Sequence, residues 1–195
     1  MMCEIGGKTM YGIKIKTKKA EGEYDVGASK MLGDPVLPEA LSDSLPQTAM
    51  FLMQIRLKDI AELDEEGLLP HEGYLYFFLD TEDGLYSLKP LVKYVKEEPT
   101  HHIEGWNEIV DGFEEYNRDF LIEFERCEED AEGNKLLGCP SDWQYAQEPE
   151  RLLFQLDPLD DPEMGILNTL DGFLYFFFDE DVKNFDHIKL VEDIS

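Results

Sequence analysis

The chain has 195 residues, of which 43% are hydrophobic and 12% aromatic, a composition typical of globular proteins rather than disordered ones. Its 44 acidic and 17 basic residues give a formal net charge of −27, which aids solubility, repels nucleic acid and anionic membranes, and attracts basic proteins. Three cysteines are too few for a disulfide framework, and no apolar run approaches the roughly 20 residues of a membrane helix. We therefore expect a cytoplasmic protein.

The first predicted strand lies in the only clearly basic part of the chain. Residues 1–19 contain five lysines and one acid. Within them, residues 11–18 alternate apolar and polar side chains, which predicts a half-exposed strand with its lysines in water. Lysines of this kind discourage edge-to-edge pairing of strands. We expect residues 1–28 to form a lysine-rich segment outside the domain of residues 29–195.

Residues 29–99 contain the features of one half-domain. Two prolines within Lys30–Pro38 exclude regular helix or central strand there. Strands are predicted at 50–57, 74–79 and 91–95. The middle one lies in the motif G-x-L-Y-F-F-x-D, whose aromatic and branched residues are typical of a strand with apolar contacts on both faces.

Residues 100–133 differ in kind from the rest of the chain. Between Glu97 and Glu132 there are 14 acidic residues and two arginines. Six apolar residues recur there at spacings of three and four: Trp106, Ile109, Val110, Phe113, Tyr116 and Phe120. This spacing predicts an acidic amphipathic helix, although Gly105 and Gly112 weaken its start and continuity. Residues 120–124 fit either a continuation of the helix or a strand.

After residue 133 the features of the first half return in the same order. The matches pair Lys135–Pro140 with Lys30–Pro35, 152–156 with 51–55, Gly172–Asp179 with Gly73–Asp80, and 188–191 with 92–95. Their offsets are 105, 101, 99 and 96, and they shrink as shortened loops in a duplicated unit would make them.

These matches predict an internally duplicated α+β fold of mainly antiparallel sheets, with the acidic amphipathic helix between the two halves. The pseudo-repeats lie at about 29–99 and 134–195, and the acidic helical segment at about 100–133 joins them into one domain. Because each half alone has a small core, we expect the halves to share a core or to exchange strands.

Six stretches follow, in order, the motifs of a known family: Lys30–Pro38, Phe51–Leu57, Leu69–Asp80, Leu137–Gln144, Leu152–Asp157 and Gly172–Phe185. The family's versions of the first three are S-K-x-G-G-x-P-x-L-P, f-L-x-Q-I-n-L and L-P-x-x-G-x-L-x-F-F-x-D. On these motifs the chain resembles the YwqG-like family, a bacterial domain family of unknown function. The resemblance implies a duplicated α+β fold over most of 29–195 and brings no catalytic residue or cofactor. Leu32 and Leu137 replace the first of the family's paired glycines, and 163–167 replace its G-D-W segment.

Two glutamines inside equivalent apolar strands are the main candidates for a site. A buried amide needs hydrogen-bond partners, and a strand glutamine can bridge to an irregular loop. The amides of Gln54 and Gln155 therefore either pin loops or face a ligand. The residues of the neighbouring loops in question are Gly33, Pro35, Gly138 and Pro140. We expect a cleft at the seam between the halves, near these residues, to be the working surface.

Other patterns give little support for metal binding or catalysis. Carboxylates gather at Asp179, Glu180, Asp181 and Asp186, and again at Asp157, Asp160 and Asp161. Lys183 interrupts EF-hand spacing in the first group. His101 and His102 lack a third fixed ligand, and Cys139 lacks a base nearby in the sequence. Nucleotide-binding and hydrolase motifs are absent. We predict no metal, no cofactor and no catalytic residue.

The sequence therefore favours a non-enzymatic binding or protein-interaction module. A second hypothesis is an acidic inhibitor or immunity-type protein that neutralises a basic toxin such as a nuclease. Its basis is the charge concentrated in 97–132 and 157–193, which would speed association with a basic partner. An enzyme of unknown type is the third hypothesis. The expected partner is a protein, with nucleic acid and membranes excluded, and the sequence leaves the oligomeric state open.

Overall fold

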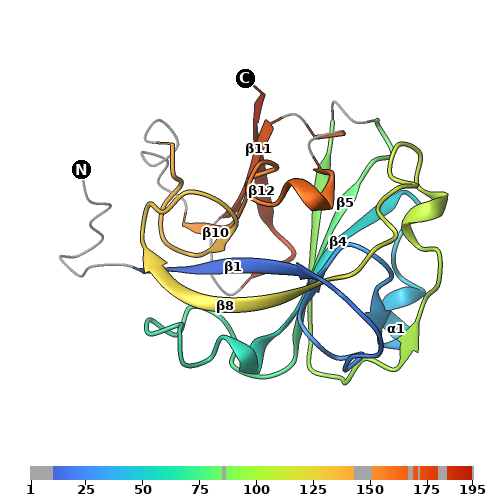
Figure 1. The fold of residues 1–195 in the computed structure, drawn as a ribbon, viewed down its shortest axis with the longest axis horizontal. Coiled ribbons are helices and arrows are strands. Elements are labelled where there is room, and N and C mark those ends of the chain that lie inside the picture. Colours follow the sequence, from blue (N-terminus) through green and yellow to red (C-terminus); the bar gives the residue numbers. More distant parts are fainter. Residues whose placement is uncertain are drawn as a thin grey trace.

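A ten-stranded antiparallel sheet dominates the structure, a computed structural model that describes residues 11–84, 87–142, 151–166, 169–170, 172–179 and 184–194 (Figure 1). The order of its strands is β12-β11-β10-β9-β1-β8-β2-β4-β5-β6. Their bounds are β1 Tyr11–Lys19, β2 Lys30–Met31, β4 Ala49–Arg56, β5 Tyr74–Asp80, β6 Lys89–Val95, β8 Phe120–Glu128, β9 Lys135–Leu136, β10 Leu152–Leu156, β11 Gly172–Phe178 and β12 Ile188–Ile194. A second, two-stranded sheet pairs β3 (Val36–Leu37) with β7 (His101–His102).

The described residues are mostly β, so the prediction of an α+β fold is wrong. Among them the only α-helix is the four-residue α1 (Glu39–Ser42). Three short 3-10 segments complete the helical part, namely η1 (Leu57–Asp59), η2 (Asn107–Ile109) and η3 (Pro162–Met164). None of the helices in the described part is long and apolar enough to span a membrane.

The acidic amphipathic helix predicted for residues 100–133 does not form. The stretch contains β7, η2 and β8, and residues 120–124 belong to a strand. Four amides in it donate to the carbonyl three residues earlier, those of Glu108, Val110, Phe113 and Tyr116. Successive turns thus produce the spacing of three and bury the last three of these side chains. Gly105 and Gly112 have φ values of 71° and 86°, which a continuous right-handed helix cannot contain.

β1 and β8 lie side by side in the centre of the sheet and join its two ends (Figure 1). They pair antiparallel along their whole length, from Tyr11 opposite Glu128 to Lys19 opposite Phe120. On its outer side β1 pairs with β9, whereas β8 pairs with β2. β1, which precedes the first predicted repeat, is therefore bonded to the second, and β8, which precedes the second, is bonded to the first. The strand predicted at 11–18 is present, but its place in the middle of the sheet did not follow from the sequence.

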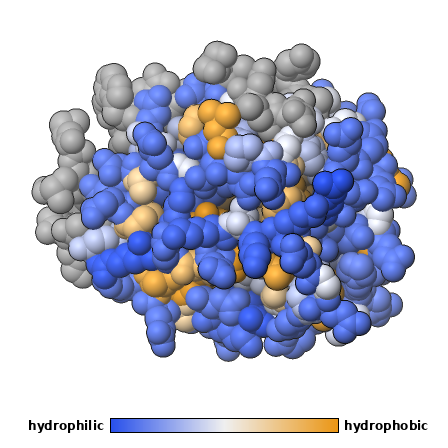
Figure 2. All heavy atoms as spheres, viewed as in Figure 1, coloured by the Kyte–Doolittle hydropathy of each residue, from blue (hydrophilic) through white to orange (hydrophobic). Residues whose placement is uncertain are grey.

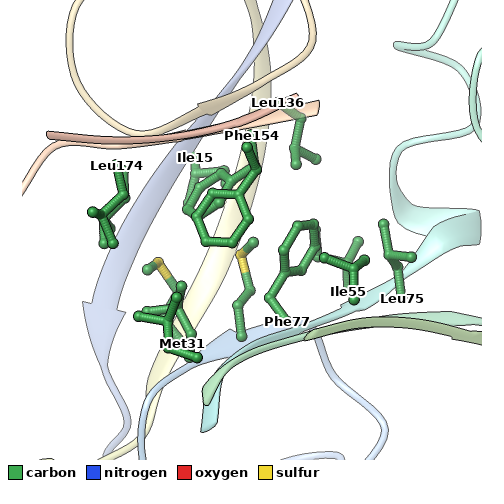
Figure 3. Close-up of a cluster of buried hydrophobic side chains, with 14 of the residues drawn as sticks. Ile15, Met31, Ile55, Leu75, Phe77, Leu136, Phe154 and Leu174 are labelled. Carbon is green, nitrogen blue, oxygen red and sulfur yellow. The ribbon is translucent and has the colours of Figure 1, made fainter. Parts of the chain in front are cut away.

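One hydrophobic core spans both halves. Its centre is Phe77 of β5, whose ring lies 5.3 Å from that of Phe154 and 5.8 Å from that of Phe176, between ring centroids. Figure 3 shows labelled side chains from β1, β2, β4, β5, β9, β10 and β11 filling the same space. Because neither half covers these rings alone, burial of this core requires both halves.

The sheet curls until its edge strands β6 and β12 approach each other without pairing as strands. Side chains bridge the gap instead. Lys93 Nζ lies 2.8 Å from Asp186 Oδ1, and the rings of Tyr94 and Phe185 lie 5.9 Å apart between centroids. The hydrogen bond from Lys93 lowers the pKa of the Asp186 carboxyl. The result is a nearly closed sheet around the core.

Replacing Phe77 by alanine should lower the free energy of unfolding by about 3–5 kcal/mol, because it leaves a cavity where rings of both halves meet. Phe173→Ala is the matched control, since Phe173 is only partly buried and belongs to a small peripheral cluster. Urea denaturation of both variants and the wild type checks this. We expect a single transition in each case, with the smaller loss for Phe173→Ala. Separate transitions for the two halves, or equal losses, would contradict the shared core.

Candidate functional site

Counted inward from the two edges of the sheet, the strands form corresponding pairs: β12 with β6, β11 with β5, β10 with β4, β9 with β2, and β1 with β8. Positions in one half of the sheet can therefore be compared with positions in the other. Ile13 of β1 lies opposite Leu136 of β9, and Phe120 of β8 lies opposite Met31 of β2. Ile13 and Phe120 are thus equivalent, and they are 107 residues apart in the sequence. The same offset makes Thr17 of β1 equivalent to a phenylalanine of β8.

Two seams result from this arrangement. At the β8 seam, the loop of residues 57–69 passes beside β8, and at the β1 seam, the loop of residues 157–166 passes beside β1. Both loops follow equivalent strands, β4 and β10, whose offset is 101. At the β1 seam Thr17 and Asp161 are in contact. By the two offsets, their equivalents in the other half are Phe124 and Ile60, both apolar.

The β8 seam is filled. Ile60 is fully buried in the main core, and Phe124 packs against that core. Arg126 lies over the ring of Tyr11, with its Cζ 3.3 Å from the ring centroid, and its Nη1 lies 2.6 Å from Glu65 Oε1. A small hollow of about 40 Å³ lies nearby, between the loop of residues 57–69, Tyr11, Leu137 and Leu152.

The β1 seam is open. Thr17 Oγ1 donates a hydrogen bond to Asp161 Oδ2, and Lys14 Nζ lies 3.0 Å from Asp160 Oδ1. Beside them is a hollow of about 680 Å³, here called the seam groove, which is lined by residues 14–19, Glu21, Asp160, Asp161 and Glu163. A second hollow of about 580 Å³ shares Glu163 with it and extends to residues 114–118. This second hollow is the counterpart of the small one near the β8 seam.

The β1 strand presents unpaired backbone groups to the seam groove. The N–H of Ile15 donates to the carbonyl of Asn134 on the β9 side, and the N–H of Ala20 donates to that of Asp119 on the β8 side. Since successive residues of a strand direct these groups to opposite sides, Thr17 and Lys19 direct theirs to the β9 side. β9 ends its pairing with β1 at Lys14. Among the described residues, none hydrogen-bonds to the backbone of Thr17 or Lys19.

The charges around the seam groove are mixed and partly uncompensated. Lys16 pairs with Glu125 at 2.7 Å, as Lys14 does with Asp160. Lys18, Lys19, Glu21, Asp161 and Glu163 form no ion pair with a described residue. The face seen in Figure 1 is largely hydrophilic, with apolar atoms in small separate patches (Figure 2). The groove can therefore bind polar or charged groups.

Gln54 and Gln155 are fully buried and bonded to backbone. Gln54 Oε1 accepts from the Val36 amide at 3.1 Å, and its Nε2 donates to the carbonyl of Ala28 at 2.9 Å. Gln155 Oε1 accepts from the Ser141 amide and its Nε2 donates to the Gly133 carbonyl, both at 2.8 Å. All four of these partners are backbone groups of the chain. Neither amide lines a hollow described above.

The other four predicted positions shape those loops. Gly33 and Gly138 have φ values of 67° and 75°, in the left-handed region. A Cβ atom at Gly33 would lie 2.2 Å from Asp119 Oδ1, and one at Gly138 would lie 2.5 Å from the Glu129 carbonyl oxygen. Pro35 and Pro140 are buried. These residues permit close packing of the loops and are not grouped around a common space.

Two buried lysines escaped the sequence interpretation, although they stand at equivalent positions before the loops. Lys30 Nζ lies 2.6 Å from Asp119 Oδ1 and also donates to the Asp34 carbonyl. Lys135 Nζ donates instead to the carbonyls of Glu129 and Ala131, at 3.0 and 2.6 Å. Burial lowers the pKa of Lys135 to about 8. The recurrence of lysine five residues before each proline was the available signal.

Among the described residues, no group of three or more His, Cys, Asp or Glu is placed to hold a metal ion. The carboxylates of Asp157, Asp160 and Asp161 accept hydrogen bonds from nearby amides of the chain. Glu180 and Asp181 lie outside the described residues. His102 Nε2 lies 4.0 Å from Asp34 Oδ2 on the surface, and Cys139 is buried.

Residues 29–105 match the model of a protein family. That family is described as Domain of unknown function (DUF1963). The match begins after β1 and ends before residue 106, so it covers Gln54 and Lys30 but none of the seam groove. No curated protein matches the chain.

The residues that make the β1 seam open were not singled out as a site by the sequence. Asp161 appeared only in a weak carboxylate group, and Thr17 lay in a segment placed outside the domain. The site could have been found from positions where the two repeats differ. Thr17 occupies the position equivalent to Phe124, and Asp161 the position equivalent to Ile60. Finding it requires the register of β1 on β8, which only the fold supplies.

Replacing Gln155 by leucine should lower the free energy of unfolding by about 1–3 kcal/mol, because the Ser141 amide and the Gly133 carbonyl lose buried partners. Gln54→Leu should cost at least as much, since its amide group bonds to three backbone groups. Thermal and urea denaturation measure both. A variant as stable as the wild type would show that the loops do not depend on these amides.

The lowered pKa of Lys135 makes stability depend on pH. Between about pH 8 and its ordinary value of 10.5, the unfolded chain holds a proton on Lys135 that the folded protein has lost. The free energy of unfolding should therefore rise with pH across this window. Lys135→Met removes this contribution, so the difference between wild type and variant, measured by urea denaturation at each pH, should grow in favour of the wild type. A difference that does not change with pH would contradict the assignment.

Proposed function

We propose that the protein is a non-enzymatic binding module whose working surface is the seam groove. The observation that carries the proposal is the seam groove itself, a hollow of about 680 Å³ lined by charged side chains and bordered by backbone groups of Thr17 and Lys19 that no described residue hydrogen-bonds. At the position of β8 equivalent to Thr17 the chain has Phe124, which packs against the main core.

The chemistry of the groove favours binding over catalysis. Binding sites in proteins are concave and use a few well-placed polar groups to orient the ligand. The seam groove has such groups in Asp161, Glu163 and the lysines of β1. The side chains most often used as nucleophile or base in hydrolytic and group-transfer enzymes, serine, cysteine and histidine, are not among the residues that line the groove.

We infer further that the chain is a YwqG-like, internally duplicated protein that works in the cytoplasm. The family match over residues 29–105 and the ordered motifs of the second half support the first part of this inference. The strand order supports the internal duplication, because corresponding strands lie at equal distances from the two edges of the sheet. The scarcity of cysteine is compatible with a reducing compartment.

A second candidate function is an acidic inhibitor of a basic protein, as an immunity protein would be. Its support is the net charge of −27 and the exposed acidic turns of residues 104–115. Glu104, Glu114 and Glu115 are exposed and form no ion pair with a described residue. Such a complex would weaken steeply as salt is added. Titration of basic proteins at low and high ionic strength tests this, and binding that is insensitive to salt would exclude it.

Thr17→Phe/Asp161→Ile copies the filled seam onto the open one and should abolish binding at the seam groove. The measurement is a thermal-shift screen of a library of metabolites and peptides, followed by pull-down of host proteins at two salt concentrations. At least one ligand should raise the melting temperature of the wild type and not that of the variant. Circular dichroism verifies that the variant is folded.

The matched control is Thr100→Phe/Asp43→Ile, which exchanges the same residue types at exposed positions away from the groove. It should bind as the wild type does. If every ligand found binds the wild type and the seam variant equally, the seam groove is not the working surface and the proposal fails.

A further inference from the structure

We propose that the seam groove accepts an extended segment of a partner protein, which adds to the sheet as a strand along β1 and places a lysine or arginine beside Asp161 and Glu163. This inference rests on the proposed function and specifies its ligand. Strand addition uses main-chain hydrogen bonds for affinity and alternate side chains for specificity. The β1 seam offers both kinds of contact.

The main-chain contacts would come from Thr17 and Lys19. Their N–H and C=O groups point away from β8, beyond the point where the pairing with β9 stops. An added strand would continue the row that β9 begins, about 4.8 Å from β1. The hollow of about 680 Å³ occupies this place. Two residues of β1 offer four hydrogen-bonding groups, which suits an extended segment of about four residues.

The side chains around the groove determine which residue types the added segment of the partner should contain. Thr17 and Lys19 lie on one face of β1, and Lys14, Lys16 and Lys18 lie on the other. On the first face Thr17 contacts Asp161, beside the exposed Glu163. The carboxylates of Asp161 and Glu163 line the groove without an ion-pair partner among the described residues, and the whole protein carries −27. A basic side chain of the partner is therefore favoured on this face, both locally and by long-range attraction.

A second copy of this chain is a poor occupant. Pairing of β1 with itself would bring Lys16, Lys18 and Lys19 of one copy against those of the other. Edge lysines of this kind are a common means of preventing self-association of sheets. Only Lys16 of these three has an ion-pair partner among the described residues, so their charges would repel.

Random linear peptides displayed on phage and selected on the full chain test the proposal. Peptides that bind the wild type and not Thr17→Phe/Asp161→Ile are then synthesised and measured by calorimetry. We expect selected peptides to be rich in Lys and Arg. N-methylation at alternate residues should weaken binding about tenfold per lost hydrogen bond, whereas methylation of the intervening residues should have little effect. The amides of Thr17 and Lys19 should become protected from hydrogen exchange.

A second double variant tests how much the charges of Asp161 and Glu163 contribute to peptide binding. Asp161→Asn/Glu163→Gln keeps the size of both side chains and the acceptor oxygen that caps η3. It should weaken a basic peptide several-fold and reduce the salt dependence of binding. Affinity for peptides that is unchanged in this variant would overturn the basic character of the segment.

The remaining outcomes separate this inference from the proposed function. Groove-dependent peptides that lack the alternating response to methylation, or that leave the Thr17 and Lys19 amides unprotected, would overturn strand addition alone. A small molecule that needs an open groove, with no peptide selected, would do the same. If neither peptide nor small molecule distinguishes the wild type from the seam variant, both proposals fail.

Discussion

The antiparallel pairing of β1 with β8 is the constraint on which the rest of the structure depends. These strands run the full length of the sheet's centre, and each is bonded outward to strands of the other half. Separation of the halves would break both sets of pairings and expose the rings around Phe77. Because hydrogen bonding and apolar burial fail together, the two halves form one cooperative unit.

The same constraint creates the difference between the seams. Each central strand is longer than the outer strand it pairs with, so part of its outer edge faces a loop instead of a strand. What fills that place depends on a few side chains. Ile60 and Phe124 pack in or against the main core, while Thr17 and Asp161 are joined by a hydrogen bond. The strand pairing is alike in both places, and the side chains differ.

Local features of the fold could be predicted from the sequence, and long-range ones could not. The strands around Phe51, Phe77, Phe154 and Phe176 follow from dense aromatic and branched residues. The stretch after Glu97 misled because turns of three residues imitate the spacing of a helix face. The positive φ angles at Gly105 and Gly112 and the extended backbone of Val110 distinguish these turns from a helix. The bonding of Gln54 and Gln155 followed from the rule that buried amides need partners.

The seam groove could not be predicted, because it depends on which strands are neighbours. The sequence indicates that Tyr11–Lys19 alternates, but not that it pairs with residues 120–128. Without that register, Thr17 cannot be compared with Phe124, and a small polar side chain alone does not indicate a binding site. Positions where two similar halves differ become meaningful only after the fold has aligned them.

On the internal duplication proposed above, the pairing of β1 and β8 across the two repeats has a consequence for the ancestry of the chain. A protein built from one half could satisfy the pairing of β1 and β8 only as a dimer of identical subunits, in which both seams would share one sequence. Whatever mutation opened one would open the other, and the dimer would lose core packing twice. Fusion of two copies into one polypeptide removes this symmetry, so that one seam can preserve stability while the other is free to diverge.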